Sequence, residues 1–101
     1  MRPLPHPSLA DLRLADVLFA FSDPNRLHIV RTLADAGEMT CAAVEVPLSK
    51  SACSRHYKVL REAGVIRMRP QGTACLNSLR RKELNQRFPG LLAAILRSAG
   101  E

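Results

Sequence analysis

Residues 49–64, SKSACSRHYKVLREAG, combine basic and hydroxyl side chains at helical spacing. Residues three and four positions apart share one face of a helix. The outer face of this segment would carry Ser51, Ser54, Arg55, Lys58 and Glu62, with Lys50 at its border. The broad inner face would carry Ala52, Cys53, His56, Tyr57, Val59, Leu60 and Ala63. Ammonium and guanidinium groups bind phosphates, and hydroxyl groups both donate and accept hydrogen bonds. The outer face therefore suits a polyanionic partner.

The charge of the chain is concentrated around this segment. Residues 50–82 contain nine Lys and Arg against one acid, Glu62, for a net charge of +8. Residues 1–49 have a net charge of −2, and residues 83–101 are neutral. A localised positive field predicts a polyanionic partner, whereas an even spread of charge would serve solubility. The alternative is a solvated surface with an accidental bias.

With duplex DNA as the polyanion, the side chains of the segment have distinct roles. A helix fits the major groove, where Arg pairs with guanine and short hydroxyl groups approach base edges. Ser51, Ser54 and Arg55 lie in the N-terminal half of the segment, the part that enters the groove in helix-turn-helix proteins, and are predicted to contact bases. Lys50 and Lys58 are predicted to bind phosphates and set the register.

A predicted hairpin adds two more cations to the same region. Its strands would span residues 65–70 and 73–79, with Gly72 at the tip. Arg67 and Arg69 alternate with apolar residues, so one face of the hairpin is cationic. This face is predicted to lie along the DNA backbone or in the minor groove. The alternative for either arginine alone is a solvated surface charge.

Start and stop signals define the elements that must position these residues. Prolines 3, 5 and 7 predict a surface arm over residues 1–7, followed by one domain over residues 8–101. The predicted elements are a helix at 9–21 capped by Ser8, a helix between Asp23 and Gly37, a short strand at 38–41, a helix of one or two turns at 42–46, the helix between Ser49 and Gly64, the hairpin, and helices at 80–88 and 90–100.

This order predicts a mainly α (α+β) fold, a winged helix-turn-helix domain with five to six helices and a wing of two to three strands. Apolar residues make up 47% of the chain and aromatic residues only 4%, so the core must be aliphatic. Such a composition favours helices over a sandwich or barrel.

The sequence resembles the ArsR/SmtB family of bacterial winged-helix transcription factors. The matching stretches are ADVLFAFSDPNRLHIVRTLADAGEMT and LSKSACSRHYKVLREAGVIRMRPQGTACLNSLR, which together span about residues 15–80. The resemblance implies a homodimer packed through its first and last helices, which binds a palindromic operator and usually represses. Independently, the runs VLFAF and LLAAIL are more apolar than a chain of this size buries easily. Leu12, Phe19, Leu91, Leu92 and Ile95 are the predicted dimer residues.

The sequence departs from the family at its metal sites. Where many members carry Cys-x-Cys in the third helix, this chain has Thr40 and Ala42 around Cys41, and the last helix contains neither His nor Asp. No cofactor is therefore expected. His28 and His56 are interpreted as packed or capping residues, whereas His6 lies on an arm expected to be mobile.

The three cysteines leave one further possibility open. Cys53 lies on the inner face of its helix and is interpreted as an inert core residue. If the strands at 39–41 and 73–79 pair, Cys41 and Cys75 become neighbours, and a thiol switch is conceivable. Nothing in the sequence indicates that either thiolate is activated.

Other function classes are weighed against a DNA-binding regulator. The sequence has no Ser/His/acid set, phosphate-binding glycine loop or paired carboxylates at a usable spacing, so an enzyme is not expected. A winged-helix module that binds proteins remains an alternative, as does a regulator whose signal is sensed by a companion protein. No secretory signal is evident and the apolar runs are too short to span a bilayer, which predicts a cytoplasmic protein.

Overall fold

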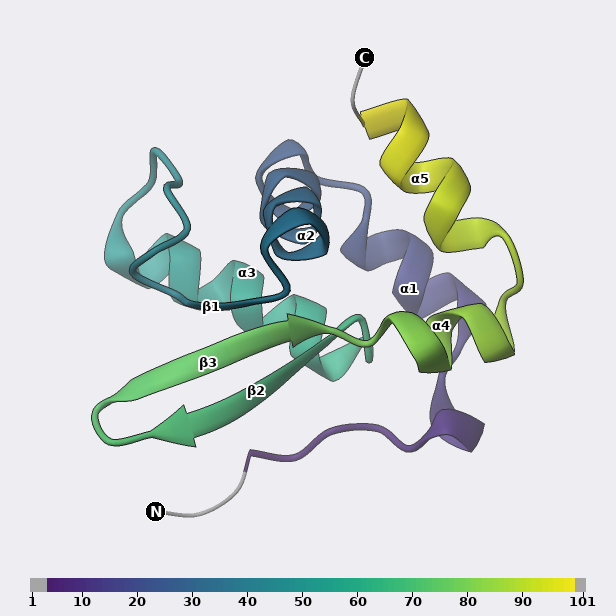
Figure 1. The fold of residues 1–101 in the computed structure, drawn as a ribbon, viewed down its shortest axis with the longest axis horizontal. Helices are drawn as coiled ribbons and strands as arrows, with labels where there is room; N and C mark the ends of the chain where they lie inside the picture. The colour runs from purple at the N-terminus through teal and green to yellow at the C-terminus, as the bar shows by residue number, and fades with distance from the viewer. Residues whose placement is uncertain (1–3, 100–101) are drawn as a thin grey trace.

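The computed structural model describes residues 4–99, which form helices around a small sheet (Figure 1). In chain order the elements are a 3-10 turn Leu9–Asp11, α1 Leu14–Ala20, α2 Pro24–Ala36, β1 Glu38–Thr40, α3 Lys50–Glu62, β2 Ile66–Gln71, β3 Ala74–Leu79, α4 Arg81–Arg87 and α5 Leu91–Ala99. Over the described residues, five α helices and a three-stranded sheet confirm the predicted mainly α winged-helix class.

The sheet is antiparallel in the order β1-β3-β2, so the hairpin of β2 and β3 forms the wing. Gly72 lies at the tip with φ +61, a conformation that suits glycine, as predicted. In the β1–β3 ladder, Thr40 pairs with Leu76 at the last register position before the chain leaves β1. The strand β2 is an edge strand, where Pro70 is tolerated because its missing N–H faces away from the ladder.

Local capping defines both ends of α2 and α3, as the sequence predicts. The Asp23 carboxylate accepts hydrogen bonds from the backbone N–H groups of Asn25, at 2.8 Å, and Arg26, at 3.1 Å. The Ser49 hydroxyl accepts the N–H of Ala52 at 3.2 Å. Gly64 follows α3 with φ +85, and a Cβ at this position would clash with the neighbouring Leu12 side chain.

The predicted continuous helix at 9–21 is wrong, because the chain is extended at Leu12 and α1 begins at Leu14. Leu12 is only 1% exposed, so its side chain turns into the interior at this point. Its carbonyl accepts the Nε–H of Arg87 in α4 at 3.2 Å. A tertiary contact thus replaces the intrahelical bond that a continuous helix would form.

The predicted short helix at 42–46 is also wrong. Residues 41–43 form a turn, and the N–H of Ala43 donates to the carbonyl of Thr40 at 3.2 Å and to its hydroxyl at 3.3 Å. Val44 is 5% exposed and joins the core. The segment ends at Pro47, and so few residues cannot offset the cost of nucleating a helix.

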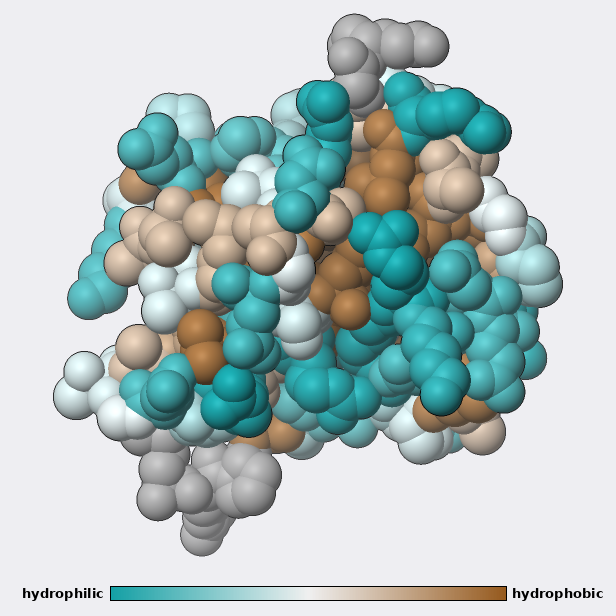
Figure 2. Space-filling model, in the orientation of Figure 1, coloured by the Kyte–Doolittle hydropathy of each residue, from teal (hydrophilic) through white to brown (hydrophobic). Residues whose placement is uncertain are grey.

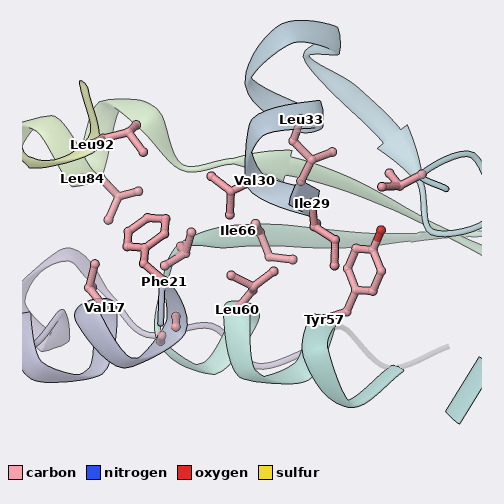
Figure 3. Packing of buried hydrophobic residues seen from close by; sticks show 14 residues of the cluster. Val17, Phe21, Ile29, Val30, Leu33, Tyr57, Leu60, Ile66, Leu84 and Leu92 are labelled. Carbon is pink, nitrogen blue, oxygen red and sulfur yellow. The ribbon is translucent and has the colours of Figure 1, made fainter. Parts of the chain in front are cut away.

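The core lies between α3, α2 and the sheet, and extends toward α1, α4 and α5 (Figure 3). Figure 3 shows Tyr57 and Leu60 of α3 directed toward Ile29 of α2 and Ile66 of β2. Tyr57 is 2% exposed and the other three are fully buried, so the inner face of α3 is fixed by apolar packing. This packing determines which side of α3 faces outward.

The described part of the N-terminal arm is attached to the domain, contrary to the expectation of mobility. The buried guanidinium of Arg61 donates to the carbonyl of Pro5 and that of Arg80 to the carbonyl of Pro7, each at 2.8 Å. The N–H of Met68 in β2 donates to Nε2 of His6 at 2.9 Å. Burial, with a smaller contribution from nearby arginines, lowers the pKa of His6, which favours its neutral form as an acceptor.

Candidate nucleic-acid interface

The helix α3 presents its cationic and hydroxyl side chains to solvent. The residues predicted to contact DNA from this helix are all exposed: Lys50, Ser51, Ser54, Arg55 and Lys58. Within residues 4–99, none of the three cations among them forms a salt bridge or hydrogen bond to a carboxylate. This face therefore has positive charge that the described chain leaves uncompensated.

The wing arginines are exposed too, but each is bound by an acid. Nη2 of Arg67 donates to Oε2 of Glu83 at 2.9 Å, and Nη2 of Arg69 donates to Oε1 of Glu38 at 3.2 Å. Glu83 belongs to α4 and Glu38 to β1. Sequence reasoning missed both pairs, which lie 16 and 31 residues apart along the chain.

Glu83 also holds a buried charge at the base of the wing. Its carboxylate accepts the Nε–H of Arg80 at 2.8 Å, and the Arg80 side chain is 4% exposed. This hydrogen bond is the main cause that keeps the pKa of Glu83 below its usual value, with a smaller contribution from Arg67. Glu83 thus links the last residue before α4 to the exposed wing.

Two of the nine cations in residues 50–82 do not belong to the outer surface. Arg61 is 8% exposed and Arg80 is 5% exposed, and both donate to arm carbonyls. The count of +8 therefore overstates the charge offered to a partner. For Arg61 a signal was present, because it lies four residues after the inward-facing Tyr57.

A buried arginine that the sequence reading did not single out fixes α3 to the first two helices. Arg26 of α2 donates to the carbonyls of Ala20, at 2.8 Å, and Phe19, at 3.0 Å, and lies over the Phe19 ring at 5.2 Å from its centre. Its Nη1 donates to Nδ1 of His56 on α3 at 3.1 Å. His56 is thus a packed residue with a positioning role for α3, in line with its predicted packing.

Asp23 completes this junction. Its carboxylate lies 4.0 Å from Nδ1 of His56 and caps α2. Desolvation opposes ionisation of Asp23, but hydrogen bonds from the Arg26 and Asn25 backbone N–H groups, together with the nearby Arg26 charge, lower its pKa. An ionised Asp23 therefore stabilises the start of α2, from which Arg26 reaches α3.

A groove of about 1010 Å³ lies beside α3. We call it the α3–wing groove; it is lined by Lys50, Ser54, Arg55, Lys58 and Arg61 of α3, Met68, Thr73, Ala74 and Cys75 of the wing, Thr40, Cys41, Ala42 and Val44, and by Leu4, Cys53 and Tyr57. The Tyr57 hydroxyl is buried without a hydrogen-bond partner within the described residues.

Among residues 4–99, no cluster of three or more His, Cys, Asp or Glu side chains is arranged to hold a metal ion.

The exposed large apolar side chains lie on the terminal helices, apart from Leu48 in the segment before α3. Leu14 is 48% exposed, Leu18 46% and Phe19 61%, all on α1. Leu91 and Ile95 of α5 are partly buried, and Figure 2 shows a strip of hydrophobic side chains along this helix. This surface includes three of the five predicted dimer residues.

The prediction is wrong for the other two proposed dimer residues, Leu12 and Leu92. Leu12 is 1% exposed and Leu92 is 2% exposed, so the core of the chain itself already covers both. They have no surface left for a partner subunit.

No helix within the described part of the chain is long and apolar enough to cross a membrane.

Comparison with known proteins agrees with this geometry. Residues 21–69 match a family described as a helix-turn-helix domain. An uncharacterized HTH-type transcriptional regulator of Bacillus subtilis, YceK, is 36% identical over 84 residues, which cover 80% of this chain and 84% of the relative. A second uncharacterized HTH-type regulator, from Methanocaldococcus jannaschii, is 33% identical over 63 residues, covering 60% of this chain and 71% of the relative.

Solved structures show the same similarity. A possible transcriptional regulator for arsenical resistance superposes with a TM-score of 0.64 at 32% identity, covering 82% of each chain. The transcriptional repressor BigR from Xylella fastidiosa superposes with a TM-score of 0.60 at 27% identity, covering 74% of this chain and 85% of that one. These relatives are transcriptional regulators rather than enzymes.

Proposed function

Because the chain belongs to the ArsR/SmtB family of winged helix-turn-helix transcriptional regulators, we propose that it is a homodimeric repressor that binds a palindromic operator. Membership in this family makes double-stranded DNA the partner. One observation carries the assignment of the DNA-binding face: the exposed cations of α3 have no acidic partner in residues 4–99, and they lie beside the wing. Phosphates would supply the missing negative charge.

The roles of the side chains follow from their positions on α3 and the wing. Ser51, Ser54 and Arg55, in the first half of α3, would contact base edges in the major groove. Lys50, at the first turn of α3, and Lys58, farther along the same exposed face, would bind phosphates. On the wing, Arg67 and Arg69 would follow the DNA backbone or enter the minor groove, once their contacts with acids are exchanged for contacts with phosphates.

The exposed apolar residues of α1 support the homodimer. Leu14, Leu18 and Phe19, with Leu91 and Ile95 of α5, provide a hydrophobic surface that a second copy would cover. A two-fold axis through the terminal helices would place two copies of α3 about 34 Å apart, one turn of DNA. A single 11.1 kDa species in sedimentation at micromolar concentration would contradict the dimer and the palindrome together.

The operator itself can be found by selecting bound duplexes from a random pool. We expect a palindrome whose half-sites are separated by about one helical turn. Replacing Arg55 with Ala should cost about 1–3 kcal/mol of affinity for the selected site and relax the preference at one base pair in each half-site. Arg31→Ala is the matched control, because Arg31 is an exposed arginine on α2, outside α3 and the wing.

Two outcomes would contradict these assignments. A uniform loss of affinity for all sequences in the Arg55→Ala variant would reassign Arg55 to phosphate binding. Absence of any selected duplex would favour a module that binds another protein, or a regulator that needs a companion sensor before it binds DNA.

A further inference from the structure

All three cysteines of the chain line the α3–wing groove. Each is a free thiol and each is partly buried. Cys41 lies in the turn after β1, Cys75 in β3, and Cys53 on α3. Side chains that belong to the predicted DNA-binding face line the same groove, so chemistry at these thiols would take place next to the proposed operator contacts.

The register of the sheet brings two of the three thiols together. Thr40 pairs with Leu76 in the antiparallel β1–β3 ladder, so one further pair would place Cys41 opposite Cys75. Asn77 lies two residues from Cys75, on the same face of the sheet. Its side-chain amide donates to Sγ of Cys41 at 3.2 Å, which places the Cys41 thiol on that face as well.

Antiparallel pairing also matches the geometry of a disulfide. Opposed residues in such a ladder have Cα atoms about 4.5–5.5 Å apart, and the Cα atoms of bonded cysteines are usually about 4.4–6.8 Å apart. A ladder extended by one pair would therefore bring the Cα atoms of Cys41 and Cys75 into the range of a disulfide. Cys53 belongs to neither strand, and its thiol faces the carbonyl of Leu48 at 4.0 Å.

We infer that Cys41 and Cys75 form a reversible disulfide on exposure to a hydroperoxide, and that this bond lowers the affinity of the protein for its operator. Formation of the disulfide does not depend on the proposed function. Its effect on operator affinity does rest on the proposed function, because that effect requires a protein that binds an operator.

The oxidation balances with hydrogen peroxide as the oxidant. The Cys75 thiolate attacks one peroxide oxygen, the O–O bond breaks, and hydroxide leaves as water, which gives a sulfenic acid on Cys75. The Cys41 sulfur then attacks the Cys75 sulfur, the S–S bond forms, and a second water is released. Burial raises the pKa of Cys41, so it ionises less readily and is assigned the second step. Cys41 gives up its proton as it attacks, and that proton leaves with the hydroxide of the sulfenic acid as the second water.

The bond would act on the path that leads into α3. Residues 41–49 connect β1 to Ser49, the N-cap of α3. The turn at the start of this path is held by the hydrogen bond from Ala43 to the Thr40 carbonyl. Drawing Cys41 onto the ladder removes it from the turn and shifts the start of α3 relative to the wing. Coupling between linked sites typically changes affinity about 5- to 150-fold, and we expect an effect in this range.

Peptide mapping tests the bond directly. The full-length protein is treated with hydrogen peroxide, quenched and digested with trypsin, which leaves the three cysteines on peptides 32–50, 51–55 and 68–80. We expect one cross-link, between peptides 32–50 and 68–80, that is two hydrogens lighter than the separate peptides and is reversed by dithiothreitol. Cys41→Ser and Cys75→Ser should abolish the link, whereas the matched control Cys53→Ser should retain it.

Operator binding is measured on the same samples. Oxidised wild type and Cys53→Ser should lose affinity, and dithiothreitol should restore it, whereas Cys41→Ser and Cys75→Ser should not respond to peroxide. Should either serine variant fail to fold by circular dichroism, the alanine variant replaces it.

The outcomes separate this inference from the proposed function. The absence of the 32–50 to 68–80 link, or a link through Cys53, overturns the dithiol pair. A link with unchanged operator affinity overturns its regulatory effect. If the link forms but the reduced protein binds no duplex, the proposed function fails while the thiol pair stands.

Discussion

The helix α3 and the wing carry cations for the same proposed partner, but the protein treats these charges differently. On α3, Lys50, Arg55 and Lys58 are exposed and have no carboxylate partner within residues 4–99. On the wing, Arg67 and Arg69 are also exposed, yet each contacts a glutamate from a neighbouring element. The cations of α3 are thus unpaired within residues 4–99, whereas the wing arginines are held in ion pairs.

This difference predicts unequal contributions to DNA binding. A phosphate that approaches α3 meets a free cation and displaces condensed counterions. A phosphate that approaches the wing must compete with a carboxylate, and that carboxylate remains nearby as a repulsive charge. We therefore expect α3 to supply most of the salt-dependent affinity. The wing, oriented by its glutamates, would mainly set geometry.

The largest expected effect comes from removing the phosphate contacts of α3. In a Lys50→Ala/Lys58→Ala variant, the slope of log affinity against log salt should become shallower by about 0.9 for each lost phosphate contact. An Arg67→Ala/Arg69→Ala variant removes the same number of cations and should change the slope less, because its arginines begin with acidic partners. Fluorescence anisotropy with a labelled duplex over a range of salt concentrations measures both slopes. Equal slopes would refute the distinction between the helix and the wing.

The ends of α2 and α3 could be predicted because capping is local. Asp23 and Ser49 lie within three residues of the backbone N–H groups that they cap, and Gly37 and Gly64 lie one and two residues after the ends of α2 and α3. The break at Leu12 could not be predicted in this way. It depends on Arg87, 75 residues away in sequence, which binds the Leu12 carbonyl.

The candidate site likewise has features that local sequence predicts and features that depend on distant contacts. Helical spacing was enough to place Ser54, Arg55 and Lys58 on the exposed side of α3, since the apolar inner face fixes the orientation of the helix. The ion pairs of the wing required the register of the sheet and the position of α4, which sequence spacing does not reveal. Local chemistry therefore identified the cations, and only the fold showed that Glu38 and Glu83 hold two of them.

The next largest effect tests how the wing is held at its base. Glu83→Gln removes the charge that faces buried Arg80 and exposed Arg67, and should cost about 1–3 kcal/mol of unfolding free energy, as for a hydrogen bond to a charged group. Urea unfolding monitored by circular dichroism measures the loss. Glu62→Gln, which removes an exposed acid from α3, is the control and should change stability little.

Glu83 also predicts a pH dependence of stability. Its pKa is lowered in the folded state from an ordinary value of 4.5, mainly by the Arg80 hydrogen bond, so the unfolded chain takes up the proton first on acidification. The contribution of Glu83 to stability is therefore complete above pH 4.5 and is lost as the pH falls through the lower folded pKa. The difference in unfolding free energy between wild type and Glu83→Gln should shrink over that window, and a constant difference would contradict the lowered pKa.

The smallest expected effect isolates the outer pair of the wing. Glu38→Gln frees Arg69 without disturbing a buried charge, because both side chains of this pair are about half exposed, at 56% for Arg69 and 44% for Glu38. Exposed ion pairs contribute about 0.2–1 kcal/mol, so stability should hardly change. Operator affinity should rise by a similar free energy, since Arg69 no longer has to exchange Glu38 for a phosphate. Asp35→Asn, which removes an exposed acid from α2, controls for the overall gain in positive charge.

The direction of the Glu38→Gln result decides what the wing acids do. A rise in affinity that exceeds the Asp35→Asn control means that Glu38 restrains Arg69, and that the wing gives up affinity to keep its arginine in place. A fall in affinity would mean that orientation by Glu38 matters more than charge, because a free arginine side chain must then lose conformational entropy when it binds DNA. In that case the wing would be a preorganised contact, and the helix and the wing would differ in how their cations are positioned rather than in how strongly they bind.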